Sequence, residues 1–123
     1  MNSSLPVDIF DNLYELIRIF RSRMRKAMEA RHPELTFNEM RLLMNTGRQP
    51  GITQKDLVEH SRIDKAQIAR TLARLQEQGW LERIPSEDDR RVRCLHLSPE
   101  GRQLFTQLRD TQEKVAAVLL EGS

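Results

Sequence analysis

The sequence has one cysteine and no long apolar run, and each shortage excludes a class of protein. Cys94 is the only cysteine among 123 residues, so no intramolecular disulfide can form. That indicates a reducing compartment such as the cytoplasm. No window approaches the roughly 18 consecutive apolar residues of a membrane-spanning helix. The first residues, MNSSLPVD, lack the basic region and apolar run of a signal peptide. We therefore expect a cytoplasmic protein with no membrane segment.

An excess of charge of one sign is also lacking. The formal net charge is only +2, with 20 basic residues against 18 acidic ones. The chain is not a generic polycation, so any nucleic-acid-binding surface must come from local placement of charge. Apolar residues make up 38% and charged residues 31% of the chain, which suits a folded protein. Its length leaves room for a single domain, residues 1–123, with one core.

Motifs that carry catalytic chemistry are missing. None of the three histidines has metal-ligand spacing to another or to Cys94, so we expect no metal site. The turn from Gly47 to Gly51 has neither the spacing nor the lysine of a phosphate-binding loop. No Ser/His/Asp or Cys/His set can be assembled. We therefore expect no enzymatic activity and no cofactor.

What the sequence does contain is concentrated between Ile52 and Gly101. This stretch predicts a helix, a tight turn, a second helix, a strand, a charged loop, another strand and the start of a further helix. Thr53 is a plausible N-cap of the first helix, with Asp56 completing a weak variant of the capping box. Residues 61–63 form the turn. The pattern predicts a helix-turn-helix over residues 53–78.

The second of these helices separates its apolar and basic residues. Asp64 is expected to cap it, with Gln67 completing a reciprocal cap, and Gly79 to end it. Its buried stripe is predicted to be Ile68, Leu72 and Leu75. From position 61 to 75 four basic residues stand against one acidic residue, and they lie off that stripe. A basic outer face suits a helix that enters the DNA major groove.

A β-hairpin is predicted behind the helix pair. Residues 80–85 and 92–97 are typical of short strands, and the loop SEDDRR between them ends in two arginines. Alternation along the second strand predicts that Leu95 and Leu97 face inward, whereas Cys94 and His96 share the other face. We interpret Cys94 as structural, because a redox role needs a lowered thiol pKa that nothing in the sequence indicates. Such a hairpin behind a helix-turn-helix is called a wing.

Two motifs in this region resemble those of a known family. The pattern Asp89-x-Arg91, followed by Leu97-Ser98-x-x-Gly101, looks like the wing signature of the MarR family of winged-helix transcription regulators. LxRLQEQGWLER, residues 72–83, is similar to the exit of that family's recognition helix. The resemblance covers nearly the whole chain. It implies a mainly α fold with a small β-wing: a winged helix-turn-helix over 36–101, with its wing at 81–98, and dimerisation helices at 7–31 and 98–121.

The helix predicted near the N-terminus is apolar on more than one side. Apolar residues recur every three or four positions from about Val7 to Ala30 and cover well over half of its circumference. The simplest cover for the second side is another copy of the protein, and the alternative is a central helix buried in its own monomer. We interpret the basic run in this helix as solvated: Arg18, Arg21, Arg23, Arg25 and Lys26.

The helices that flank the helix-turn-helix region carry strong start signals. Thr36 and Glu39 form a capping box for a helix that Gly47 is expected to end. Its methionines are expected to fill the core, although they could instead line a ligand pocket. Ser98 and Pro99 predict the start of the last helix. Family members usually carry one more helix after it, and this sequence stops at Gly122-Ser123. Either the chain is shortened or the dimer interface is reduced.

The resemblance implies a homodimeric regulator of transcription, a repressor responsive to a small aromatic ligand, that binds double-stranded DNA at an inverted-repeat operator. Residues expected near base edges are Lys65, Ala66, Gln67 and Arg70, because their side chains match the edges of adenine, guanine and thymine. Residues expected at phosphates are Arg74, Arg62 and Arg93. Arg91 is expected in the minor groove with Asp89 orienting it, and Arg90 is the rival for that role. The alternative function is a winged helix that binds another protein and not DNA.

Overall fold

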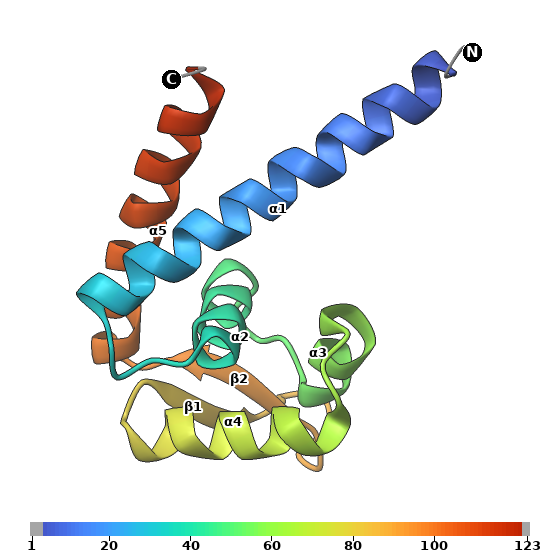
Figure 1. The fold of residues 1–123 in the computed structure, drawn as a ribbon. Helices are drawn as coiled ribbons and strands as arrows, with labels where there is room; N and C mark the ends of the chain where they lie inside the picture. The colour runs from blue at the N-terminus through green and yellow to red at the C-terminus, as the bar shows by residue number, and fades with distance from the viewer. Residues whose placement is uncertain (1–3, 122–123) are drawn as a thin grey trace. The chain divides into compact units, whose positions relative to one another are not determined.

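The computed structural model describes residues 4–121, and these form five helices and one two-stranded sheet. In chain order the elements are α1 (Leu5–Arg31), α2 (Phe37–Arg48), α3 (Gln54–Ser61), α4 (Lys65–Glu77), β1 (Leu81–Pro85), β2 (Arg93–Leu97) and α5 (Pro99–Leu120). Figure 1 shows them in colour order along the chain. The expected fold class, mainly α with a small β-wing, is confirmed. Gly122 and Ser123, where the sequence stops, lie outside the described residues.

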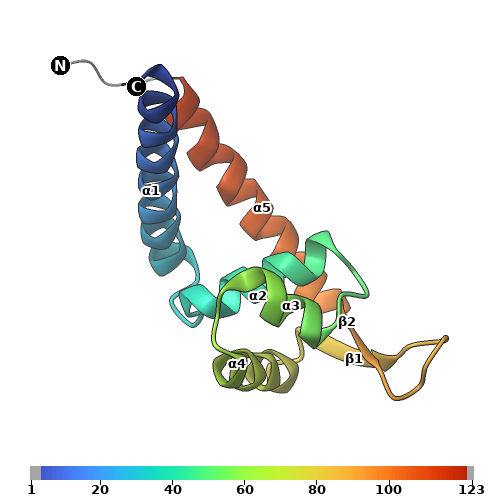
Figure 2. The same cartoon turned by 90° about the vertical axis from the view of Figure 1, so that its right-hand side faces the viewer.

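The chain divides into two units, each described here by itself. One contains the residues up to Glu34 and those from Asp110 on, and the other contains Leu35–Arg109. The second unit holds α2, α3, α4, the sheet and the first half of α5. Figure 2 shows its β1–β2 loop extending beyond the helices.

In the first unit, α1 is a long helix with a largely uncovered apolar surface. It begins two residues earlier than expected, with a proline in its first turn, and stops where His32 precedes Pro33. The Arg31 guanidinium donates a hydrogen bond from Nη1 to Thr111 Oγ1 of α5 at 2.8 Å. Along α1 the buried side chains are Met24 and Met28. The large apolar residues that remain exposed on it are Leu5, Val7, Ile9, Phe10, Leu13, Tyr14, Leu16 and Ile17.

The second unit contains a continuous aliphatic core. Leu81 of β1 is buried, and the fully buried side chains come from every other element of that unit: Leu42, Leu43, Met44, Leu57, Ile68, Leu72, Leu75, Leu95 and Leu108. The predicted stripe of the second helix-turn-helix helix is therefore confirmed, and so is the inward placement of Leu95 and Leu97. Cys94 and His96 are half-buried on the other face of β2, as expected. The methionines of α2 fill the core, since both Met40 and Met44 are buried.

The predicted capping box of α2 is confirmed, but its predicted end is wrong. Thr36 Oγ1 accepts from the Glu39 backbone N–H at 3.1 Å, and the Thr36 N–H donates to Glu39 Oε1 at 2.7 Å. The helix continues through Gly47 to Arg48. A Cβ at Gly47 would collide with the ring of Phe105 on α5, so this glycine provides room for helix packing and does not end the helix.

The hairpin has the expected antiparallel pairing, with strands one residue shorter than predicted. Its register pairs Leu81 with Leu97 and Pro85 with Arg93. Trp80 is excluded from β1 because its N–H caps α4: it donates to Leu75 O at 3.0 Å, while the Gly79 N–H donates to Gln76 O at 3.0 Å. This is a Schellman motif, and Gly79 supplies its left-handed residue with φ +79°. The predicted glycine stop of α4 is thus confirmed.

A third segment extends the sheet on the free edge of β2. The Gly51 N–H donates to Leu95 O at 2.8 Å, and the Leu95 N–H donates to Ile52 O at 2.8 Å. Thr53 and Cys94 form an isolated bridge next to this pair. The segment that leads into α3 is therefore tied to the wing strand, which fixes the base of the helix-turn-helix against the hairpin.

Candidate nucleic-acid interface

The first helix of the pair, α3, is held at both ends. Thr53 and Asp56 form a complete capping box with two hydrogen bonds of 3.1 Å, stronger than the weak variant expected. The backbone N–H of Thr53, followed by the Thr53 hydroxyl, lowers the pKa of Asp56 from its usual value. At the other end Arg62 adopts the left-handed conformation with φ 60°, and Ser61 Oγ accepts from the Ile63 N–H at 3.2 Å. The tight turn, residues 62–64, lies one residue later than predicted, because Ser61 still belongs to α3.

The second helix, α4, begins at the predicted place without the predicted side-chain cap. Asp64 is the N-cap residue, and its carbonyl accepts from the Ile68 N–H at 2.9 Å. Its carboxylate makes no capping hydrogen bond, so the expected reciprocal cap with Gln67 is wrong. Both side chains are exposed, where water competes for their hydrogen bonds. Asp64 and Gln67 therefore remain on the surface.

The two faces of α4 differ sharply in chemistry. The inner face consists of Ile68, Thr71, Leu72 and Leu75, all buried. The outer face carries the side chains that the sequence predicted to meet DNA, all exposed: Lys65, Ala66, Gln67, Arg70 and Arg74. The structure thus brings three polar side chains together on one helix face. The amide of Gln67 and the guanidinium of Arg70 lie in the first turns, and Arg74 lies one turn further along.

Arg74 differs from the rest of this face because it has a protein partner. Its Nε lies 3.5 Å from Oε2 of Glu39, whose side chain is only 3% exposed, while the Arg74 side chain is 59% exposed. A second contact from α2 reaches the other helix of the pair: Arg41 Nη2 donates to the Ser61 carbonyl at 2.8 Å. Helix α2 thus contacts both α3 and α4 through charged side chains.

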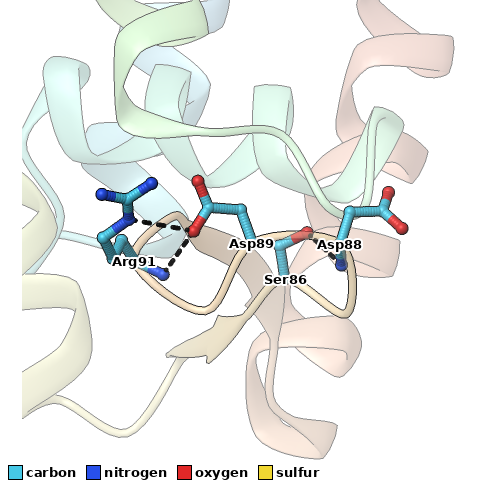
Figure 3. A network of polar contacts seen from close by, with 4 residues as sticks. All are labelled: Ser86, Asp88, Asp89 and Arg91. Atoms are coloured by element: carbon cyan, nitrogen blue, oxygen red, sulfur yellow. Dashed lines mark hydrogen bonds and ion pairs between the residues drawn. The ribbon is translucent and has the colours of Figure 1, made fainter.

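At the wing tip an aspartate holds an arginine. Asp89 Oδ1 accepts from the Arg91 backbone N–H at 3.0 Å and from Arg91 Nε at 3.3 Å (Figure 3). The hydroxyl of Ser86 accepts from the Asp88 N–H at 3.2 Å and shapes the other side of the loop. The Arg91 side chain is 92% exposed. The wing therefore presents Arg91 on a carboxylate support, as the DxR pattern implied.

The other two wing arginines occupy different surroundings. Arg90 is exposed beside Arg91, and Arg93 is exposed at the first position of β2. The tip also carries the exposed acidic residues Glu87 and Asp88, so it is a local arrangement of single cations and not a basic patch. Among the residues described, the contact with Asp89 distinguishes Arg91 from Arg90.

Two residues that shape this interface were missed from the sequence. Glu39 was identified only as a helix cap, and Arg41 was not singled out at all. The TxxE pattern explained one oxygen of Glu39, and no local pattern predicts a partner for the other. Such pairs join distant parts of the chain, and sequence spacing carries no signal for them.

Within residues 4–121, no group of three or more histidine, cysteine, aspartate or glutamate side chains could hold a metal ion. In the same part of the chain, no helix is both long enough and apolar enough to cross a membrane.

Comparison with known proteins gives a consistent family. Residues 34–92 match the family model of the MarR family. The chain is 27% identical over 95 residues to YybA of Bacillus subtilis (strain 168), an uncharacterized HTH-type transcriptional regulator, covering 77% of this chain and 63% of YybA. A crystal structure of MarR is 28% identical, covers 98% of this chain and 80% of that chain, and has a TM-score of 0.73.

A crystal structure of Streptococcus pneumoniae FabT in complex with DNA is 21% identical with a TM-score of 0.77, covering 94% of this chain and 82% of that chain. At that identity the likeness concerns the fold alone. The match to YybA spans less than two thirds of that protein's length. The family model, the helix-turn-helix with its wing and the likeness to MarR agree, and all three point to the MarR family.

Proposed function

We propose that this protein is a transcriptional regulator that binds double-stranded DNA sequence-specifically as a homodimer. The observation that carries the proposal is the outer face of α4, where Gln67 and Arg70 are exposed while the opposite face is fully buried. The FabT structure, which has a similar fold, is a complex with DNA. A helix-turn-helix places its second helix in the major groove, so the same use of α4 is the simplest account of its chemistry.

Base reading is assigned to the first turns of α4. The amide of Gln67 can pair with adenine at two points, and the guanidinium of Arg70 can pair with the two acceptors of guanine. Ala66 can contact the methyl group of thymine, and Lys65 can donate to guanine. All four side chains are exposed at the start of α4, and Gln67 and Arg70, three positions apart, lie on the same face of the helix.

Backbone anchoring and minor-groove contact are assigned to arginines around this helix. Three exposed cations are suited to phosphates: Arg74, Arg62 and Arg93. Arg91, held by Asp89, is the proposed minor-groove residue, because a narrow minor groove attracts a single guanidinium. Arg90 is the rival residue for this contact. Among the residues described, Asp89 contacts the side chain of Arg91, which favours Arg91.

The homodimer is assigned to the unit that contains α1 and the end of α5. An apolar groove of about 220 Å³ runs between these helices, lined by Leu16, Ile17, Phe20, Ala116, Leu119 and Leu120. This groove and the exposed apolar residues of α1 form an apolar surface too large to be a set of isolated surface hydrophobic residues. Such a surface indicates an interaction site. A two-fold axis would place two α4 helices in successive major grooves, so the operator should be an inverted repeat with half-site centres about 10 base pairs apart.

We also propose that the regulator responds to a small aromatic anion. A hollow of about 670 Å³ lies along α1, lined by Tyr14 and Ile17 and by several cations, among them Arg18 and Arg21. Arg18 is already paired with Glu15, which raises the pKa of Arg18 and keeps it charged. An aromatic ring with a carboxylate or phenolate matches this mixture of apolar and cationic groups. In this proposal the protein is a repressor that leaves its operator when the ligand binds.

Two rival functions differ in what they require. A winged helix that binds another protein would need an apolar or acidic outer face on α4, which the exposed cations oppose. An enzyme would need a cluster of reactive groups, and membership of a family of regulators argues for DNA binding instead. A regulator of this kind would act in the cytoplasm, where DNA is accessible.

The decisive experiment is selection of bound sequences from random duplex DNA by the purified protein, repeated with phenolic compounds. Enrichment of one inverted repeat supports the proposal, and loss of binding with a phenolic compound supports the ligand response. Absence of any enriched sequence, with a folded protein at micromolar concentration, would exclude sequence-specific regulation and leave the protein-binding function.

A further inference from the structure

Glu39 is a buried carboxylate that serves two parts of the structure at once. Its Oε1 accepts the Thr36 N–H at 2.7 Å and completes the cap of α2. Its Oε2 lies 3.5 Å from Nε of Arg74, on the outer face of α4. The side chain is 3% exposed and cannot itself reach a ligand outside the protein. Among the residues described, Arg74 is the exposed side chain whose charge pairs with Glu39.

The partner in this pair is well placed to bridge. The Arg74 side chain is 59% exposed, so one side of its guanidinium meets Glu39 while much of the group faces solvent. A guanidinium carries five N–H donors in a planar fork, and a contact through Nε leaves terminal amino donors for a second acceptor. The buried charge also favours the pair, because an unpaired buried carboxylate is costly.

The wing repeats this arrangement independently. Asp89 Oδ1 accepts from Nε of Arg91 at 3.3 Å, which again leaves the terminal amino groups on the far side of the carboxylate. One carboxylate-supported arginine therefore stands on α4 and another on the β1–β2 loop. Arg70, on the same helix face as Arg74, has no such contact among those described for residues 4–121.

We infer that Glu39 is a positioning residue for DNA binding, which holds Arg74 so that its terminal amino groups meet a backbone phosphate. The inference rests on the proposed DNA-binding function. It predicts that Glu39, which does not contact DNA itself, changes the affinity for DNA through Arg74. It also predicts the direction of that change. Removing an acidic residue generally strengthens binding to DNA by reducing repulsion. Removing the charge of Glu39 should weaken it.

The chain offers variants that separate positioning from stability. Glu39→Gln keeps an acceptor for the Thr36 N–H, since glutamine serves in capping boxes, but loses the charge that holds Arg74. Thr36→Ala removes the cap hydroxyl and leaves the ion pair. Glu77→Gln removes an exposed acidic residue at the end of α4 and reports the general charge effect. Arg74→Ala removes the proposed contact, and Glu39→Gln/Arg74→Ala closes the cycle.

Each variant would be titrated with the selected operator and with a random duplex across a salt series, at a temperature where circular dichroism shows it folded. Arg74→Ala should weaken both duplexes about tenfold, the worth of one charge-assisted hydrogen bond, and lower the salt slope by about 1. Glu39→Gln should weaken both less strongly, whereas Glu77→Gln should not. Thr36→Ala should lower thermal stability alone. In the Arg74→Ala background Glu39→Gln should have no further effect.

The opposite results are equally distinct. If Glu39→Gln binds as tightly as Glu77→Gln, or if its loss adds to that of Arg74→Ala, Glu39 is only a structural partner and the inference is overturned. If Arg74→Ala does not fold, Arg74→Lys replaces it: it keeps the charge but has a single ammonium, and should weaken binding without changing the salt slope. A folded wild type that binds neither duplex overturns the proposed function itself, which no variant comparison would do.

Discussion

Asp89 accepts two hydrogen bonds from Arg91 with the same carboxylate oxygen, one from the backbone N–H at 3.0 Å and one from Nε at 3.3 Å. The backbone contact fixes the tip of the wing, and the contact with Nε orients the Arg91 side chain. A loop held only by solvent would leave this long side chain to sample many rotamers, and ordering it on binding would cost entropy. The pair reduces that cost before DNA is met.

Arg91→Ala should weaken operator binding by about 1–3 kcal/mol and leave the free energy of unfolding unchanged, because the side chain is almost fully exposed. Asp89→Ala should cause part of the same loss by releasing the arginine. Arg90→Ala is the matched control and should have the smaller effect. Titration of the selected duplex at fixed salt measures all three. Equal losses for the two arginines would show that the wing acts by charge alone.

Gln67→Ala should cost about 1–3 kcal/mol at the operator and relax the preference at one base pair, because an amide can contact adenine at two points. Gln76→Ala changes the same residue type on the same helix, at an exposed position near its end, and should leave base preference intact. Sequence selection repeated with each variant tests this. A changed preference for Gln76→Ala alone would place a different part of α4 in the groove.

Gly101→Ala should destabilise the protein by about 3 kcal/mol or prevent folding. A Cβ at this position would collide with the carbonyl oxygen of Trp80, a backbone atom that cannot rotate away. That carbonyl also accepts the Ser98 N–H at 3.0 Å, while the Ser98 hydroxyl donates to Gly79 O. Chemical unfolding monitored by circular dichroism measures the change.

Gly79→Ala provides the comparison for Gly101→Ala. A Cβ at Gly79 meets nothing within 4 Å, but its φ of +79° is unfavourable for alanine. The cost should be about 1–2 kcal/mol, from the left-handed conformation alone. A larger loss at Gly79 than at Gly101 would contradict the packing argument.

Arg62→Gly should raise the free energy of unfolding by about 1 kcal/mol relative to Arg62→Ala, because Arg62 has φ 60° and glycine adopts this region without strain. Both variants lose the same charge. If Arg62 contacts a phosphate, both should bind DNA more weakly by the same factor, with the salt slope lowered by about 1. A difference in salt slope between the two would show that the turn conformation, and not the charge, governs binding.

Leu16→Glu should weaken the homodimer by about 100-fold or more, because it places an unpaired charge in the apolar groove between α1 and α5. Operator affinity should fall far more than affinity for a single half-site. Ser22→Glu adds the same charge at an exposed polar position of α1 and should leave the dimer intact. Light scattering and half-site titration measure both. A wild type that is monomeric yet binds a full inverted repeat tightly would contradict the dimer.

The elements themselves could be predicted because their signals are local. The caps of α2 and α3, the stripe of α4 and the start of α5 each depend on residues a few positions apart, the range over which helix caps and periodicity act. The motif LSxxG also contains a local contact, because Ser98 Oγ accepts the Gly101 N–H at 3.0 Å. The amino-acid sequence alone thus determined the order of elements and the side chains on the outer face of α4.

Only the tertiary structure decided which distant residues meet. It joined Glu39 to Arg74, moved the end of α2 past Gly47 to fit Phe105, and used Trp80 to cap α4. It also left Asp64 without its expected side-chain cap. These contacts depend on how packed helices are oriented, and residue spacing along one helix contains no information about a neighbour. Periodicity along the sequence therefore determined which face of each helix is buried or exposed. Helix packing determined which charged residue, such as Glu39, lies beside an exposed arginine.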